Sequence, residues 1–168
     1  MSTNNVLLCI GGNLGDRLEN LEETRDFIEF NMGDIVTVSG IYESPAWGME
    51  AAPDFLNQVI EISTSLNYLQ LLAEIKEIEE FYGRKRTPGK YTSREMDVDI
   101  LFFNDEIVET EKLTIPHPRL HERRFVLTPL AEILPDKIHS VLNKSIAELL
   151  KSCEDTSPVK RVWKTIST

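Results

Sequence analysis

Cysteine is rare in this sequence, and long hydrophobic runs are absent. Cys9 and Cys153 form no metal-binding spacing, so we expect two reduced thiols in a cytoplasmic protein. The longest apolar runs, Val6–Ile10 and Ile100–Phe103, are far short of a membrane span, and the N-terminus lacks the features of a signal peptide. We therefore predict a cytoplasmic chain without a membrane partner, and its 168 residues favour one domain, residues 1–168.

Positive charge is also scarce. The sequence has 18 Lys and Arg against 28 Asp and Glu, and its net charge of −10 disfavours a nucleic-acid partner. The cations nevertheless gather in two segments: 117–124, with two histidines, and 84–94, which contains no acid and carries Arg84, Lys85, Arg86, Lys90 and Arg94. This clustering predicts one local anion site, although two solvated loops that balance nearby acids are equally compatible with it.

Apolar periodicity predicts a mixed α+β fold. Four strands are expected at 6–10, 35–42, 56–64 and 97–103, with one helix after Asp16 and another that stops at Gly83. The order strand–helix–strand–strand–helix–strand fits a ferredoxin-like sandwich, a mainly antiparallel sheet with helices packed on one face. After it we expect a return strand at 107–108 beyond an Asn104-Asp105 turn, helices near 124–133 and 145–151, and a final strand at 159–166.

Two carboxylates on one predicted strand are the sharpest chemical signal. Asp97 and Asp99 are two residues apart, so they share a face, and their mutual repulsion is about 2 kcal/mol at an effective dielectric of ~20. A divalent cation would reverse this cost, and paired hard oxygen ligands suit Mg²⁺. Nine aspartates in 168 residues give about half of one such spacing by chance, so the neighbouring cations carry much of the inference.

Other residues near predicted loops are compatible with a bound nucleotide and a planar ring. His117 stands between two prolines, beside cations that suit phosphate, and Asn57 offers a donor and an acceptor for a heterocycle edge. Aromatic side chains near loops are either ordinary core or rim residues or stack on such a ring: Trp47, Phe55, Tyr91 and Phe125. The glycine-rich turn at 11–15 matches neither the Rossmann fingerprint nor a P-loop.

Seven segments together carry a family resemblance. They are Ile10-Gly-Gly-Asn-Leu14, Tyr42-Glu-Ser-Pro45 with Gly48, Pro53-Asp-Phe-Leu-Asn57, Glu79 with Gly83-Arg84, Arg94-x-x-Asp97-x-Asp99-Ile-Leu, Leu113-Thr-Ile-Pro-His117 and Arg123-Arg-Phe125. From Val6 to about Ile133 the chain resembles the 6-hydroxymethyl-7,8-dihydropterin pyrophosphokinases of folate biosynthesis. The resemblance implies transfer of the β,γ-pyrophosphoryl group of ATP to the pterin hydroxymethyl oxygen, with release of AMP.

The same resemblance implies roles for individual residues. Asp97 and Asp99 would hold two Mg²⁺ ions, with Arg84 and Arg94 as the further catalytic residues. ATP, the co-substrate, would contact Arg86, Ile100, Lys112, Thr114, His117 and Arg123. The pterin would contact Ser44, Pro45, Trp47, Phe55, Asn57 and Phe125. Glu79 would order the basic loop at 84–94.

Two alternatives come from other functional classes. A non-catalytic ferredoxin-like module would bind RNA or a metabolite, but the chain lacks the basic face and aromatic strand motif of an RNA binder, and such a module would have no use for Asp97 and Asp99 together. A two-metal nucleotidyl transferase would attack the α-phosphorus and release pyrophosphate instead of AMP. We expect a monomer.

Overall fold

The computed structural model describes residues 3–46, 52–83 and 95–163. An antiparallel sheet lies at its centre in the order β5-β1-β4-β3-β8, with β2 also paired to β4. The strands are β1 (Asn4–Gly12), β2 (Asp34–Val38), β3 (Ile41–Ser44), β4 (Phe55–Thr64), β5 (Asp97–Phe103) and β8 (Lys160–Trp163). With β2 and β3 counted as one interrupted strand, this is the predicted ferredoxin-like order, and β5 forms one edge.

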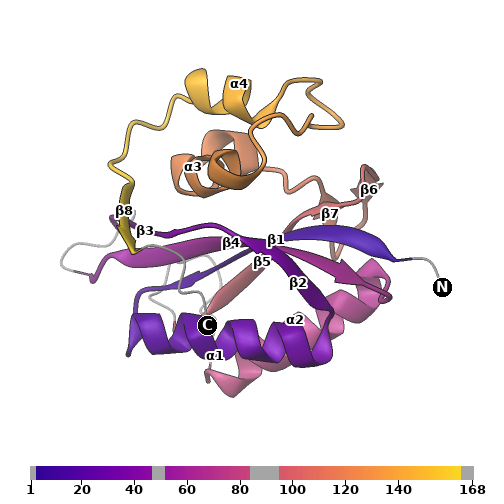
Figure 1. Ribbon diagram of the computed structural model, residues 1–168, viewed down its shortest axis with the longest axis vertical. Coiled ribbons are helices and arrows are strands. Elements are labelled where there is room, and N and C mark those ends of the chain that lie inside the picture. The colour runs from indigo at the N-terminus through magenta and orange to yellow at the C-terminus, as the bar shows by residue number, and fades with distance from the viewer. Residues whose placement is uncertain (1–2, 47–51, 84–94, 164–168) are drawn as a thin grey trace.

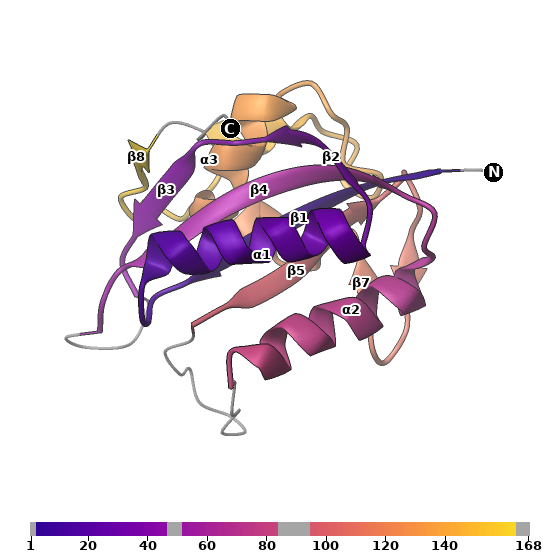
Figure 2. The same ribbon diagram turned by 60° about the horizontal axis from the view of Figure 1, so that its bottom comes forward.

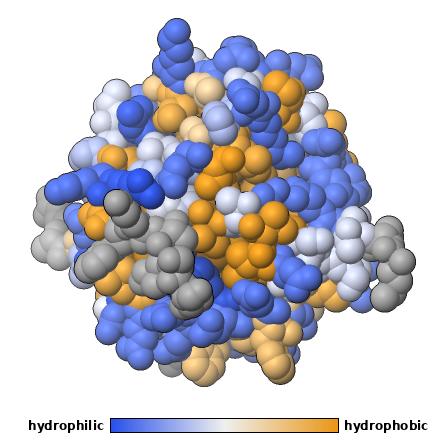
Figure 3. Space-filling view, viewed as in Figure 1, coloured by the Kyte–Doolittle hydropathy of each residue, from blue (hydrophilic) through white to orange (hydrophobic). Residues whose placement is uncertain are grey.

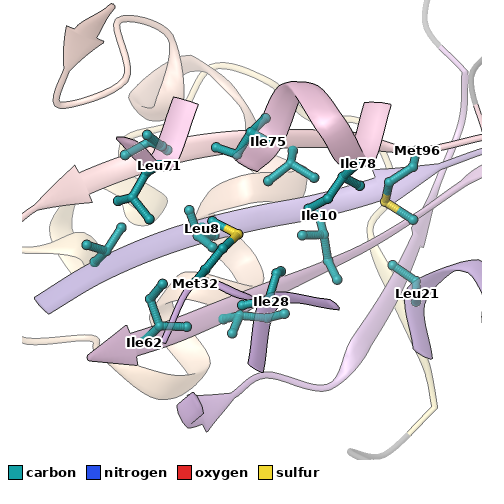
Figure 4. Close-up of a cluster of buried hydrophobic side chains, with 14 of the residues drawn as sticks. Leu8, Ile10, Leu21, Ile28, Met32, Ile62, Leu71, Ile75, Ile78 and Met96 are labelled. Carbon is teal, nitrogen blue, oxygen red and sulfur yellow. The ribbon is translucent and has the colours of Figure 1, made fainter. Parts of the chain in front are cut away.

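Helices α1 (Arg17–Asn31) and α2 (Tyr68–Phe81) cover one face of the sheet, as predicted (Figure 2). Asp16 caps α1 by accepting from the Glu19 N–H, and Asn67 forms a capping box with Gln70 at the start of α2. The buried side chains between the helices and the sheet are shown in Figure 4: Leu21 and Ile28 from α1, Leu71, Ile75 and Ile78 from α2, and Leu8, Ile10 and Ile62 from the strands. Each such side chain contributes about 1.5–3 kcal/mol of hydrophobic stabilisation.

Helices α3 (Arg124–Ile133) and α4 (Ile146–Lys151) cover the opposite face, which the predicted helix arrangement did not include (Figure 1). Leu7 and Cys9 of β1 pack there against Val126 and Leu130 of α3 in a second apolar cluster. The continuous apolar run of β1 explains this, because a strand buried on both faces has no polar alternation. Both helices begin within a residue of their predicted starts.

Two predicted strands differ from the structure. The segment 35–42 is interrupted at Ser39, whose Oγ accepts from the Val59 N–H at 2.9 Å while Gln58 Nε2 donates to the Ser39 carbonyl at 2.7 Å. The Ser39 N–H still donates to the Val59 carbonyl at 2.9 Å, but the two side-chain bonds interrupt the regular ladder and separate β2 from β3. The predicted return strand is β6 (Val108–Glu109), and it pairs with β7 (Thr114–Ile115) instead of β5.

The surface in Figure 3 is mostly hydrophilic, with a hydrophobic area near the middle of the view. Within residues 3–46, 52–83 and 95–163, no helix is both long enough and apolar enough to cross a membrane. Cys9 is buried and Cys153 is partly buried, and both are free thiols.

Candidate active site

Asp97 and Asp99 share one face of the edge strand β5, as predicted. Both are half-buried, whereas Val98 and Ile100, which alternate with them, are each 4% exposed and belong to the core beneath α1 and α2. The carboxylates therefore lie on the face that carries α3. In the sheet register Asp97 is opposite Gly11 and Asp99 is opposite Cys9.

The electrostatics around Cys9 show that charged groups converge at this place. Burial raises the pKa of the Cys9 thiol, the negative charges of Asp99 and Asp97 raise it further, and Arg123 opposes them. Arg123 precedes α3, so the sheet and the helix layer each contribute charge to one site. Arg123, from the second basic segment, and the two carboxylates thus all act on the same buried thiol.

A pocket of about 410 Å³ lies beside β5, between α2 and the segment that contains the β6–β7 hairpin. Five of the predicted metal- and ATP-binding residues line it: Asp99, Ile100, Lys112, Thr114 and His117. The hairpin turn is closed by Thr110, whose backbone N–H and hydroxyl both donate to the Leu113 carbonyl, at 2.9 and 3.1 Å. This closure places Lys112 at the exposed tip of the hairpin.

His117 enters the pocket as a neutral side chain with a defined donor. Its Nδ1 accepts from the Arg119 N–H at 3.2 Å, which places the imidazole proton on Nε2. Burial and, to a smaller extent, the charge of Arg123 lower the pKa of His117 to about 4, although Asp97 acts in the opposite direction. At neutral pH an uncharged Nε2–H is therefore available to donate to an anionic ligand.

Because the pKa of His117 is lowered in the folded chain, the free energy of unfolding falls as the pH falls. His117 is protonated below about pH 6.5 in the unfolded chain but only below about pH 4 in the folded chain. Its contribution to stability is therefore fully present above pH 6.5 and is lost as the pH falls through this window. We expect His117→Gln to reduce the loss of unfolding free energy between pH 6.5 and pH 4.5, measured by urea denaturation. An unchanged slope relative to the unsubstituted chain would contradict this assignment.

Next to the carboxylates, one cross-strand row joins four strands. Tyr42 on β3, Asn57 on β4, Gly11 on β1 and Asp97 on β5 are successive partners in register. Two strand spacings separate Asn57 from Asp97, about 10 Å between backbones. A Cβ at Gly11 would lie 2.1 Å from Asn57 Oδ1, so the glycine leaves the space that the Asn57 amide occupies.

The other residues predicted for the pterin lie around this row. Phe55 and Ser44 are paired two positions further along β4 and β3, with Ser44 buried and Phe55 half-buried, and Pro45 follows as an exposed residue. Phe125 is on α3, where the Arg123 guanidinium lies 5.7 Å from its ring centroid. The fold thus brings together β3, β4 and α3, which are far apart in the sequence (Figure 1).

Comparisons with known proteins agree with this arrangement. Residues 7–135 match the family model described as 7,8-dihydro-6-hydroxymethylpterin-pyrophosphokinase, or HPPK. The chain is 42% identical over 147 residues to a 2-amino-4-hydroxy-6-hydroxymethyldihydropteridine pyrophosphokinase of Aquifex aeolicus, covering 85% of this chain and 88% of that protein. A protein of the same name from Bacillus subtilis is 40% identical and covers 96% of this chain, with 92% of its own length matched.

The chain belongs to the HPPK family. The predicted family and the assignment as a transferase of this class are therefore confirmed. The HPPK fold is confirmed by a crystal structure of Plasmodium falciparum HPPK-DHPS with pteroate, which has a TM-score of 0.74 at 20% identity. The match covers 89% of this chain but only 42% of that larger chain.

Four of the predicted HPPK site residues lie outside the described ranges: Trp47, Arg84, Arg86 and Arg94. The loop at 84–94, which Glu79 is expected to order, lies outside the described ranges, and the Oε2 of Glu79 accepts from the Val98 N–H of β5 at 3.5 Å. That bond lies between the two aspartates in the sequence. It ties the end of α2 to the carboxylate pair.

Residues of α2 line the HPPK pocket without having been predicted to do so. Leu72, Ile75 and Lys76 join Glu79 on the pocket wall. Ile75, Lys76 and Glu79 follow Leu72 by three, four and seven residues, a spacing visible in the sequence that puts all four on one face of the helix. Nothing in that spacing distinguishes a pocket wall from a core-facing stripe, so the signal was not specific.

The carboxylate pair fits a particular kind of metal ion. Within the described part of the chain, no group of three or more His, Cys, Asp or Glu side chains could hold a metal ion. Two carboxylates do suit Mg²⁺, which usually keeps several waters and takes further oxygens from the phosphates of a substrate. The donor set of Asp97 and Asp99 therefore fits ions that are shared with a triphosphate.

Proposed function

We propose that ATP binds in the pocket beside β5 and that 6-hydroxymethyl-7,8-dihydropterin binds over the row from Asn57 to Asp97. As an HPPK, the chain transfers the pyrophosphoryl group of ATP to this pterin in folate biosynthesis. The observation that carries the binding proposal is the place of Asp97 and Asp99. Asp99 lines the pocket, and Asp97 belongs to the cross-strand row, two strands away from Asn57. The pair therefore lies between the two proposed binding sites.

On this proposal, the residues of the pocket hold the nucleotide so that its β-phosphorus lies over the carboxylates. Ile100 and Thr114 contact the adenine and ribose, and Lys112 approaches from the hairpin tip. Cationic and N–H donors bind the phosphate oxygens: the Nε2–H of His117, Arg86 and Arg123. Two Mg²⁺ ions at Asp97 and Asp99 would neutralise charge on the triphosphate and polarise the attacked phosphorus.

The pterin is held at the other end of the row. Asn57 reads the edge of the heterocycle, with Ser44 and Pro45 beside it, and Phe55, Phe125 and Trp47 enclose the ring. The hydroxymethyl oxygen then attacks the β-phosphorus. The hydroxyl gives up its proton, its oxygen bonds to the β-phosphorus as the bond from that phosphorus to the α,β-bridging oxygen breaks, and AMP leaves with the bridging oxygen. Arg84 and Arg94 stabilise the charge that develops in this transition state.

An assay that separates AMP, ADP and pyrophosphate tests the reaction. With ATP, Mg²⁺ and the pterin, we expect AMP and pterin pyrophosphate in equal amounts and no free pyrophosphate, and we expect no turnover when EDTA removes the metal. Free pyrophosphate would indicate attack at the α-phosphorus instead. Binding of ATP or pterin by the folded protein without AMP formation would support a non-catalytic binding module.

We also propose that residues 1–168 act as one catalytic domain and as a cytoplasmic monomer that does not bind nucleic acid. The support is the single sheet that lies between both apolar clusters, the two free thiols and the net charge of −10. Light scattering on the preparation used for the assay should give a mass of 19.2 kDa. Twice that mass would contradict the monomer.

A further inference from the structure

Glu132, near the end of α3, accepts hydrogen bonds from three other segments of the chain. The Tyr42 hydroxyl donates to its Oε1 at 2.6 Å, and the Gly40 N–H donates to both carboxylate oxygens at 3.1 and 3.2 Å. Arg161 on β8 contributes Nη2 at 3.4 Å. One carboxylate thus joins α3 to the break between β2 and β3, to β3 itself and to β8.

The partners of this carboxylate differ in burial, since the Glu132 side chain is 28% exposed and that of Arg161 is 45% exposed. Tyr42 is 7% exposed, and burial together with the bond to Glu132 raises the pKa of its hydroxyl to about 12, so it remains a donor. A Cβ at Gly40 would lie 2.4 Å from Arg161 Nε, so the Arg161 side chain packs directly against the backbone at that position. Glu132 is therefore bonded on one side to a buried phenol and on another to a partly exposed guanidinium.

Glu132 is on the same side of α3 as Phe125. The two residues are seven apart, which is two turns of helix and about 10 Å along its axis, with a net rotation of only about 20°. Phe125 is the ring that we propose stacks on the pterin. A helix anchored at Glu132 consequently fixes both the rotation of α3 and the height of Phe125 above the sheet.

Tyr42 extends the same connection into the sheet. It is the direct cross-strand partner of Asn57, the residue that we propose reads the pterin edge. The bond from Tyr42 to Glu132 therefore links the row that carries Asn57 to the helix that carries Phe125. It spans the two layers between which the pterin is held.

We propose that Glu132 is a positioning residue for the pterin half of the site, and that it acts by holding α3 at a fixed distance from β3. Glu132 does not contact the substrate on this proposal. It determines the separation between the Phe125 ring and the Asn57 row, and this inference rests on the proposed pterin site. The binding of ATP should change less, because the residues that line the proposed ATP pocket come from α2, β5 and the segment 110–118 rather than from α3.

The test is the KM for each substrate in Glu132→Gln, with Tyr42→Phe as the second variant. Glutamine keeps the size of the side chain but has only one acceptor oxygen for the three donors, so the contact with Tyr42 or Gly40 is weakened. We expect the KM for pterin to rise about 3- to 10-fold, the range set by aromatic stacking, while the KM for ATP changes by less than about twofold. Tyr42→Phe should give a smaller change in the same direction, and the double variant should show less than the sum because both act on one hydrogen bond.

Glu29→Gln on α1 is the matched control, because it removes the same charge from an exposed position on the other side of the sheet. It should leave both KM values unchanged. Equal rises of both KM values in Glu132→Gln, or no change in either, would overturn the positioning role. Absence of AMP formation by the unsubstituted chain would instead contradict the proposed function, so the two failures are distinguishable.

Discussion

Asp97→Ala or Asp99→Ala should abolish pyrophosphoryl transfer in a protein that remains folded. Both side chains are half-buried on the face that carries α3, and neither belongs to an apolar cluster. Removal of either leaves one carboxylate to hold the metal ions that would neutralise the triphosphate. Because electrostatic stabilisation of this kind supplies much of the rate, we expect kcat to fall about a thousandfold or more.

The measurement is AMP formation at saturating ATP and pterin, with circular dichroism to confirm the fold. Asp34→Ala serves as the control, since Asp34 is an exposed aspartate at the first position of another strand, β2. It should retain full activity. Near-normal turnover in either Asp97→Ala or Asp99→Ala would remove the metal assignment.

Gly11→Ala should both destabilise the protein and weaken its binding of the pterin. The new Cβ would lie 2.1 Å from Asn57 Oδ1 and 2.6 Å from the Leu56 carbonyl oxygen. Strand β1 is an interior strand of the sheet, with β4 and β5 bonded on either side, so its backbone cannot move away from the contact. We expect the free energy of unfolding to fall by about 2–3 kcal/mol, as for other overpacked sites.

Urea denaturation and the KM for pterin measure the two effects. The double variant Gly11→Ala with Asn57→Ala separates them, because it removes the clash with the amide but not the clash with the Leu56 carbonyl. It should recover part of the stability and none of the pterin affinity. If Gly11→Ala alone matched the unsubstituted chain in both measurements, the close approach of Asn57 to Gly11 would not matter in solution.

The local elements were predictable where the pattern is strong. The strand at Asp97–Phe103 and the helix at Arg124–Ile133 agree with the structure at both ends. In contrast, the interruption at Ser39 was not predictable from its own neighbourhood. It depends on hydrogen bonds to Gln58 and Val59, about 20 residues away. An alternating segment does not indicate which residues of another strand will form hydrogen bonds with its backbone.

The candidate site was predictable in its composition but not in its arrangement. The spacing of Asp97 and Asp99 was enough to place them on one face, because side chains alternate along any strand. The proximity of His117 and Arg123 to them was suggested by clustered charge and by the family resemblance, but not by any local pattern. Gly11 was interpreted as part of a turn, since its contact with Asn57 arises from the pairing of β1 with β4.

By itself, the sequence determined the strand–helix order, the paired carboxylates and, through its motifs, the pyrophosphokinase family. Each of these depends on residues that are near in the chain or on a pattern of residue types. The tertiary structure alone decided that α3 covers the opposite face of the sheet, that α2 contributes a pocket wall, and that Glu132 joins three distant segments. Such contacts depend on which surfaces are buried together when the sheet forms, and local periodicity contains no information about that choice.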